Sequence, residues 1–352
     1  MAHKDIDDDR SVNSADEALS EMLGISISDM KFPQDIPTAG SMNNDNADGI
    51  HTTIQREVIP TIPYDEIKTI LDERNCRNMY QMESVCILPE KLFIGQKLLM
   101  RITDELNYGS SKFKSDKSFE KIQYLKNSMM IQERRVLTRF ENFVNHHPEW
   151  KRLTDYCALC CSALMGEEMV LFKEKLNLKP PGGSGFAPHL DSPSLSVAFG
   201  DSGPQTFVTV MVAIDDMTEQ NGCLKVCKGT WSEDCHLDVL TPDENDNDPD
   251  AGGRRGAILS DVAHNQEYEP IICKGGTIFC FNGWVPHRSS ANVSPFSRRA
   301  VFLTYNAARE GNFHDLYYER MRQLRDDYRN KMLRNAQIDQ DADLAALKSI
   351  PN

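Results

Sequence analysis

The hydrophobic period of the chain changes near Glu168, and this change limits the folds that the chain can adopt. Before that point, apolar residues recur three and four positions apart, which is typical of amphipathic helices. Beyond it, short segments alternate in polarity or are continuously apolar, and Gly, Pro and Asn separate them, as between antiparallel strands. A helical half followed by short strands favours a mainly β jelly-roll barrel buttressed by N-terminal helices.

The predicted elements follow from these two periods. Helices are expected over residues 64–75, 119–147, 149–166 and 313–347. Strands are expected over residues 169–179, 206–217, 275–289 and 298–308, with a further strand after the Asn221–Gly222 turn. The cluster "CALCC" in the third helix is interpreted as small buried residues, because no second cysteine pair lies at zinc-ligand spacing.

Three regions are expected from composition. Residues 1–58 form an acidic, disordered extension, and residues 1–60 hold 12 acidic against 4 basic side chains. Residues 59–312 form the jelly-roll domain, with a helical N-terminal half and a polar insertion near 241–268. Residues 313–352 form a C-terminal helix and tail, which either pairs two copies in a homodimer or packs on its own barrel.

The bulk properties exclude several classes of protein. A net charge of −14 argues against a nucleic-acid surface, which needs a basic stripe. No apolar run reaches the length of a membrane span, and no secretory signal or peroxisomal tail is visible. Ten cysteines without a signal peptide indicate free thiols in a reducing compartment, so a cytoplasmic location is expected.

The motif "HLD" is the first candidate for chemistry. If His189 and Asp191 lie on one strand, their side chains share a face and project into the barrel. Of the other histidines, only His287 follows a convincing strand. Two histidines and one carboxylate would make the facial triad of a non-haem ferrous site with open positions. The alternative for His189 and Asp191 alone is a capped surface turn.

Two residues beyond the second histidine extend the pattern. Ser289 lies two positions after His287 and shares its strand face. Arg298 lies 11 positions after His287, and its planar guanidinium suits the far carboxylate of 2-oxoglutarate. Because strand faces alternate, Arg298 and Arg299 cannot both point inward. The five residues together indicate a ferrous 2-oxoglutarate site far more specifically than an H-x-D motif alone.

These residues resemble the phytanoyl-CoA dioxygenase family of Fe(II)- and 2-oxoglutarate-dependent oxygenases, from about residue 168 to residue 307. The similar segments are "LNLKPPGGSGFAPHLDSPS", "VAIDDMTEQNGCLKVCKGTW" and "GGTIFCFNGWVPHRSSANVSPFSRRAVFLTYN". The resemblance implies a cupin-like double-stranded β-helix and an oxidoreductase that uses Fe(II), O2 and 2-oxoglutarate, with ascorbate as reductant in vitro. It assigns iron to His189, Asp191 and His287, and 2-oxoglutarate to Arg298, Ser289, Lys175 and Met211.

The chain departs from the family pattern at two points. Leu190 stands where Gln is common, and Gly229–Thr230–Trp231 replaces a Gly-Ser/Thr-His signature. Neither change removes a ligand, although both alter the pocket. Because Asp191 is present, a halide has no vacant ligand position, and halogenation is disfavoured.

Within the family, "LTRFENFV" and "LFKEKLNLKPPGGSGF" are most similar to hydroxylases of small aminophosphonates such as 2-aminoethylphosphonate. A cationic strand face is expected to bind the anionic group of the substrate, and on a helix Arg139 and Glu141 are expected to meet its phosphonate and ammonium. The candidate substrate residues are Arg139, Glu141, Asn142, Lys173 and Asn177. The alternative for the strand face is an exposed edge strand whose lysines prevent pairing with another chain. The alternative for Arg139 and Glu141 is a salt bridge on a helix surface.

The sequence is therefore compatible with three alternative functions. The first is hydroxylation of an unactivated C–H in a small zwitterion, with release of succinate and CO2. The second is oxidation of another substrate of the family, an acyl-CoA or a secondary metabolite. The third is a non-catalytic module that binds 2-oxoglutarate or a metal ion.

Overall fold

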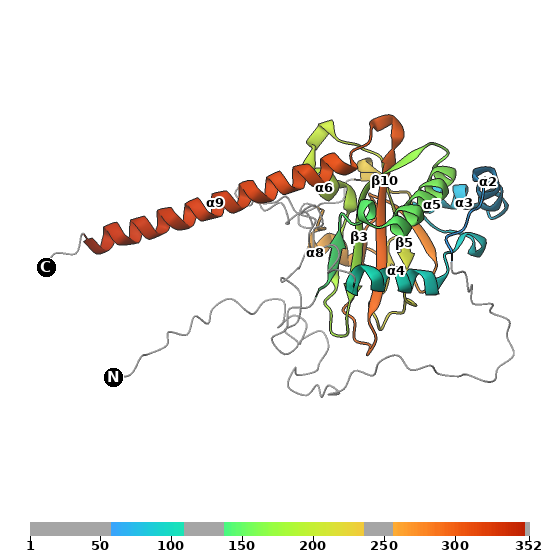
Figure 1. Ribbon diagram of the computed structural model, residues 1–352, viewed down its shortest axis with the longest axis horizontal. Helices are drawn as coiled ribbons and strands as arrows, with labels where there is room; N and C mark the ends of the chain where they lie inside the picture. The colour runs from blue at the N-terminus through green and yellow to red at the C-terminus, as the bar shows by residue number, and fades with distance from the viewer. Residues whose placement is uncertain (1–57, 109–136, 236–255, 349–352) are drawn as a thin grey trace. The chain divides into compact units, whose positions relative to one another are not determined.

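The computed structural model describes residues 58–108, 137–235 and 256–348 (Figure 1). Several predicted features lie outside these residues. They are the acidic extension up to residue 57, the start of the helix predicted over 119–147, and residues 241–255 of the polar insertion.

Two antiparallel sheets form the centre of the fold. The larger sheet has, in order, β1 (Val85–Ile87), β8 (Ile278–Asn282), β5 (Phe207–Ala213), β10 (Arg298–Ala307), β3 (Met169–Lys179) and β2 (Arg139–Glu141). The smaller sheet has, in order, β4 (Phe186–His189), β9 (His287–Ser289), β6 (Leu224–Val226) and β7 (Glu269–Pro270). The two sheets with their flanking helices make a jelly roll, as the sequence predicts.

Helices flank the sheets. The described helices are α2 (Tyr64–Glu73), α3 (Cys76–Glu83), α4 (Gln96–Tyr108), α5 (Pro148–Met165), α6 (Asp191–Leu195), α8 (Ser260–His264) and α9 (His314–Lys348). α5 has clear end signals, because Pro148 occupies its first position and Gly166 ends it with a φ of 77°. In the part of the chain that the structure describes, no helix combines the length and apolar character needed to cross a bilayer.

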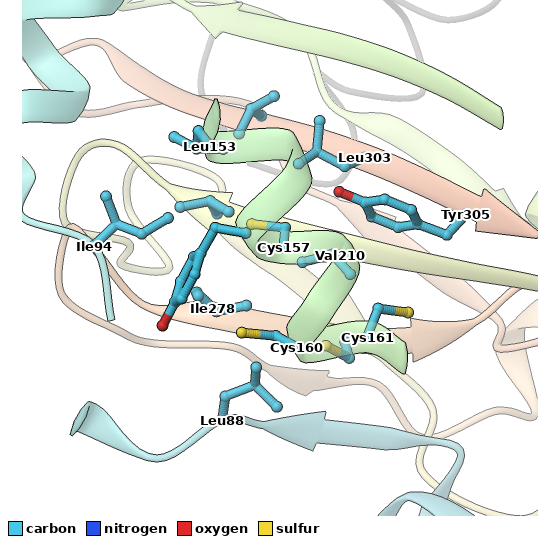
Figure 2. Packing of buried hydrophobic residues seen from close by; sticks show 14 of the residues in the cluster. Leu88, Ile94, Leu153, Cys157, Cys160, Cys161, Val210, Ile278, Leu303 and Tyr305 are labelled. Carbon is cyan, nitrogen blue, oxygen red and sulfur yellow. The ribbon is translucent and has the colours of Figure 1, made fainter. Parts of the chain in front are cut away.

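The larger sheet is buried on both faces, and alternate residues of its strands enter different cores. From β5, Val208, Val210 and Val212 pack toward the helices, whereas Met211 and Ala213 pack toward the smaller sheet. Figure 2 shows α5 lying on the helical side, with its three cysteines among the apolar side chains of the sheet. The "CALCC" segment is therefore a buried helical segment of free thiols, as predicted.

The prediction of a helix through residues 138–147 is wrong. Arg139–Glu141 forms β2, which pairs with β3, and the chain then turns at Asn142 with a φ of 54°. A short 3-10 helix follows over Val144–His146. The carboxylate of Glu174 accepts hydrogen bonds from the backbone N–H groups of Phe143 and Val144, at 2.9 and 3.0 Å, which holds the turn on β3.

Candidate metal centre and its surroundings

The H-x-D motif spans the end of a strand and the start of a helix. His189 is the last residue of β4, and Asp191 is the first residue of α6, so the prediction that both lie on one strand is wrong. His287 begins β9 and lies directly opposite His189 in the ladder. The turn of the chain at Leu190, rather than strand alternation, brings the Asp191 carboxylate toward the two imidazoles.

Three ligand atoms converge at this point. One atom each from His189, Asp191 and His287 lies within 4.8 Å of the other two. The Asp191 Oδ1 atom is 4.0 Å from His189 Nε2 and 3.8 Å from His287 Nε2. Two imidazole nitrogens and one carboxylate form the donor set of a facial triad, which suits a divalent iron and leaves positions open.

Both imidazoles are held in the form that a metal ion needs. His189 Nδ1 donates a hydrogen bond to the Ala187 carbonyl at 2.7 Å, and His287 Nδ1 donates to the Val285 carbonyl at 3.0 Å. Each bond fixes the proton on Nδ1 and leaves Nε2 with a free lone pair. Burial lowers the pKa of both histidines, that of His189 to about 3, so neutral imidazoles are present at neutral pH.

Asp191 stays ionised although it is buried. Burial alone would raise its pKa, but Lys175, His287 and His189 together hold the pKa below its ordinary value. Lys175 Nζ lies 3.9 Å from Asp191 Oδ1. The other oxygen, Oδ2, accepts a hydrogen bond from the Thr209 hydroxyl at 3.2 Å, which orients the carboxylate.

A pair of buried cations lies on the same face of the larger sheet. Lys179 and Arg298 are opposite each other on β3 and β10, and both are almost fully buried. Burial, and then the neighbouring Arg298, lowers the pKa of Lys179 to about 6. Within the described residues neither side chain forms an ion pair with a carboxylate, and Arg298 Nε has no hydrogen-bond partner. An anion placed here would give Arg298 Nε a partner and would favour the charged form of Lys179.

Ser289 and Gly222 accept hydrogen bonds from the Lys179 and Arg298 side chains. Lys179 Nζ donates hydrogen bonds to the Ser289 hydroxyl at 2.9 Å and to the Ser290 carbonyl at 2.7 Å. Both cations also donate to the Gly222 carbonyl. Gly222 has a φ of 70°, and a Cβ there would lie 3.0 Å from Lys179 Nζ and clash with the Ser290 carbonyl. Only glycine lets the turn approach the cations this closely.

A second charged cluster lies on β2 and β3. Glu141 Oε1 is 3.1 Å from Arg139 Nε and 3.5 Å from Lys173 Nζ. In the ladder Glu141 lies opposite Lys175, so these side chains share the face that carries Lys179. Burial would raise the pKa of Glu141, but Lys173 and then Arg139 hold it below its ordinary value.

The remaining predicted residues occupy the following positions. Lys175 and Met211 flank Phe302 in the ladders, so all three share the face toward the smaller sheet. Asn177 shares this face, and its Oδ1 is buried without a hydrogen-bond partner. Asn142 lies just beyond β2 and is not part of the helix predicted there.

Sequence reasoning missed three contacts. The Lys179–Arg298 pairing depends on the strand register, and the Thr209 contact with Asp191 depends on the packing of α6. The hydroxyl of Tyr317, on α9, lies 2.7 Å from Lys173 Nζ. A polar residue within an apolar strand was the only available signal for Thr209, and no signal indicated Tyr317.

The sequence was also compared with protein families and with known proteins. The family model "Phytanoyl-CoA dioxygenase (PhyH)" matches residues 103–300. The chain is 40% identical to the 2-aminoethylphosphonate dioxygenase of Uncultured bacterium HF130_AEPn_1 over 184 residues, which are 50% of this chain and 62% of that protein. It is 34% identical to the methylphosphonate hydroxylase of Gimesia maris over 160 residues, which are 45% of this chain and 54% of that protein. The matched parts thus span somewhat over half the length of these relatives.

Among solved structures, the crystal structure of EctD from S. alaskensis with 2-oxoglutarate and 5-hydroxyectoine has a TM-score of 0.46 and 19% identity, over 66% of this chain and 76% of that chain. The family match covers more than half of the sequence and includes all three residues of the His-Asp-His cluster. The chain belongs to the phytanoyl-CoA dioxygenase (PhyH) family of iron- and 2-oxoglutarate-dependent oxygenases.

Proposed function

We propose that this chain is a dioxygenase that hydroxylates a C–H bond of a small organophosphonate, with an aminophosphonate zwitterion as the preferred substrate. The observation that carries the proposal is the placement of two cationic clusters on one sheet face, with the His-Asp-His cluster beside that face. Two anionic ligands, a co-substrate and a substrate, would fill them.

His189, Asp191 and His287 would hold the metal ion, because their protonation states and orientation fit a divalent cation. Bound iron would supply the activation of dioxygen, coupled to oxidative decarboxylation of 2-oxoglutarate. In the overall balance one oxygen atom enters succinate, the other enters the hydroxylated product, and CO2 leaves.

Arg298, Ser289 and Lys179 would hold the far carboxylate of 2-oxoglutarate. The carboxylate would pair with the buried Arg298 guanidinium, give its Nε a partner, and favour the charged form of Lys179. Met211, next to Phe302 in the ladder, would form an apolar wall for the carbon chain. Lys175, close to Asp191, would lie near the metal end of the co-substrate.

Arg139 and Lys173 would hold the phosphonate. Both side chains contact the Glu141 carboxylate, and Lys175 lies opposite Glu141 in the ladder. Their positive charge suits a phosphonate, which at neutral pH carries about the −1.5 to −2 charge of a phosphate monoester. Glu141 would remain available to an ammonium group, and Asn177 and Asn142 would add polar contacts.

The comparisons support this substrate class. The two relatives described above are named for 2-aminoethylphosphonate and for methylphosphonate, and both compounds carry a phosphonate group. An acyl-CoA or a secondary metabolite is the competing substrate class, and a non-catalytic binding module is the competing function.

The test is succinate formation by purified protein with Fe(II), ascorbate and 2-oxoglutarate. The panel contains 2-aminoethylphosphonate, its N-trimethyl form, methylphosphonate, short acyl-CoAs and simple amino acids. We expect the phosphonates to stimulate succinate formation, His189→Ala to abolish it, and His264→Ala, at an exposed histidine, to leave it unchanged. Stimulation by another compound alone would replace the substrate, and absence of any turnover would leave a binding module.

A further inference from the structure

Tyr317 of helix α9 contacts the charged cluster on β2 and β3. The family match ends at residue 300, so this helix lies beyond the matched residues. The Tyr317 ring packs 4.9 Å from the ring of Phe172, and Lys173 Nζ lies 5.0 Å from the Tyr317 ring centroid. These contacts hold the ring in one place, with 4% of the residue exposed.

The hydroxyl of Tyr317 has a proton without an acceptor. Its oxygen accepts a hydrogen bond from Lys173 Nζ at 2.7 Å, and the hydroxyl makes no other hydrogen bond within the described residues. A phenol has one proton to donate, and a buried donor without a partner is costly. The hydroxyl therefore lies beside the cluster, because the same Lys173 Nζ is 3.5 Å from Glu141 Oε1.

The Tyr317 hydroxyl is able to donate a hydrogen bond. Burial raises the pKa of Tyr317, so the phenol keeps its proton at neutral pH. A second residue of the same helix, Arg325, acts on the cluster by helping to lower the pKa of Glu141. Tyr317 and Arg325 of α9 thus bring a hydroxyl and a positive charge toward the cluster.

We infer that Tyr317 is a substrate-binding residue, whose hydroxyl donates a hydrogen bond to an oxygen of the phosphonate that Lys173 and Arg139 attract. The inference rests on the proposed function, and it adds a specificity residue from α9. It also gives the predicted C-terminal helix a role in the site, independent of whether that helix pairs two copies of the chain.

The neighbouring tyrosine is a matched control. Tyr318 is also buried on α9, but its one hydroxyl proton has acceptors in Glu174, whose carboxylate and carbonyl oxygens lie 3.0 and 2.9 Å away, and its oxygen accepts from the Glu174 backbone N–H at 3.2 Å. Its role is to hold the helix on β3. Replacing either tyrosine by phenylalanine removes one hydroxyl and keeps the ring, so the two variants separate substrate binding from helix docking.

The experiment measures KM and kcat for 2-aminoethylphosphonate and methylphosphonate, KM for 2-oxoglutarate, and the slow succinate formation without substrate. For Tyr317→Phe we expect KM for both phosphonates to rise by about tenfold or more, since a hydrogen bond to a charged group is lost. The KM for 2-oxoglutarate and the substrate-free rate should stay unchanged. Tyr318→Phe should leave every KM unchanged and lower the melting temperature.

Three outcomes decide the matter. Unchanged phosphonate KM values in Tyr317→Phe would overturn the inference and leave the proposed function standing. A wild-type enzyme that no phosphonate stimulates would overturn both. If Tyr317→Phe lost its melting transition, Lys173→Met would replace it, because the cation is removed and the tyrosine ring stays; an unchanged phosphonate KM in that variant would again overturn the inference.

Discussion

At the scale of single residues, the most informative feature is a buried charge without its counterion. Lys179 and Arg298 share the Gly222 carbonyl as an acceptor, and neither pairs with a carboxylate in the described part of the chain. Burying two like charges close together is unfavourable, and the lowered pKa of Lys179 means that this amine is largely uncharged in the free protein at neutral pH. The far carboxylate of 2-oxoglutarate, if bound here, would pair with Arg298 and favour the charged form of Lys179, and both effects would contribute affinity.

We therefore predict that Lys179→Met weakens 2-oxoglutarate binding by about tenfold to a hundredfold, which corresponds to a loss of roughly 1.5–3 kcal/mol. Calorimetric titration of the protein with 2-oxoglutarate measures this change without turnover. Lys274→Met is the control, because that side chain is 85% exposed and pairs with Asp216. Equal affinities for wild type and Lys179→Met would remove Lys179 from the co-substrate site.

At the scale of elements, the buried carboxylate of Glu174 connects three parts of the fold. One oxygen accepts from the turn after β2, and the other accepts from Tyr318 and from His314 Nε2 at 2.8 Å. Glu174 lies on the opposite face of β3 from Lys173 and Lys175. The start of α9 is therefore fixed to the strand that carries the substrate cations.

The His314–Glu174 pair predicts a pH dependence of stability. Burial would lower the pKa of His314, but Glu174 and then Asp315 raise it above 6.5 in the folded state. A raised folded pKa means that the stabilisation is complete below the unfolded pKa and is lost as pH rises through the folded value. Chemical denaturation of wild type and His314→Gln should show a stability difference at pH 6 that shrinks by pH 9. A difference that is independent of pH would contradict this account.

The elements also show what the sequence could and could not predict. The long strands β3, β5 and β10 were predictable because alternate side chains enter different cores. The three residues of β2 are too few to show a period, so Arg139–Glu141 was assigned to a helix. The meeting of Lys179 with Arg298, and of Tyr317 with Lys173, depends on register and docking between distant segments, which local pattern does not encode.

At the scale of the whole molecule, the helical half and the sheet share one core that contains most of the thiols. Of the ten cysteines, Cys235 is exposed, Cys273 is partly buried and the other eight are buried. Burial raises the pKa of these buried thiols, that of Cys160 to about 12. A thiol without its thiolate form reacts slowly, so the intact fold protects these residues.

Titration of the native protein with a thiol-reactive disulfide should therefore label Cys235 rapidly and Cys273 slowly. The remaining eight cysteines should react only after denaturant unfolds the protein. Peptide mapping identifies the labelled residues. Rapid native labelling of Cys157, Cys160 or Cys161 would contradict the packing of α5 against the sheet.

We propose that the metal centre directs one oxygen atom of dioxygen into a small phosphonate. Turnover of 2-aminoethylphosphonate under ¹⁸O₂, followed by mass spectrometry of both products, tests this proposal most directly. We predict one labelled oxygen in succinate and one in a hydroxylated phosphonate. Labelled succinate beside unchanged phosphonate would contradict the proposal, because the co-substrate would then be consumed without oxidation of the proposed substrate.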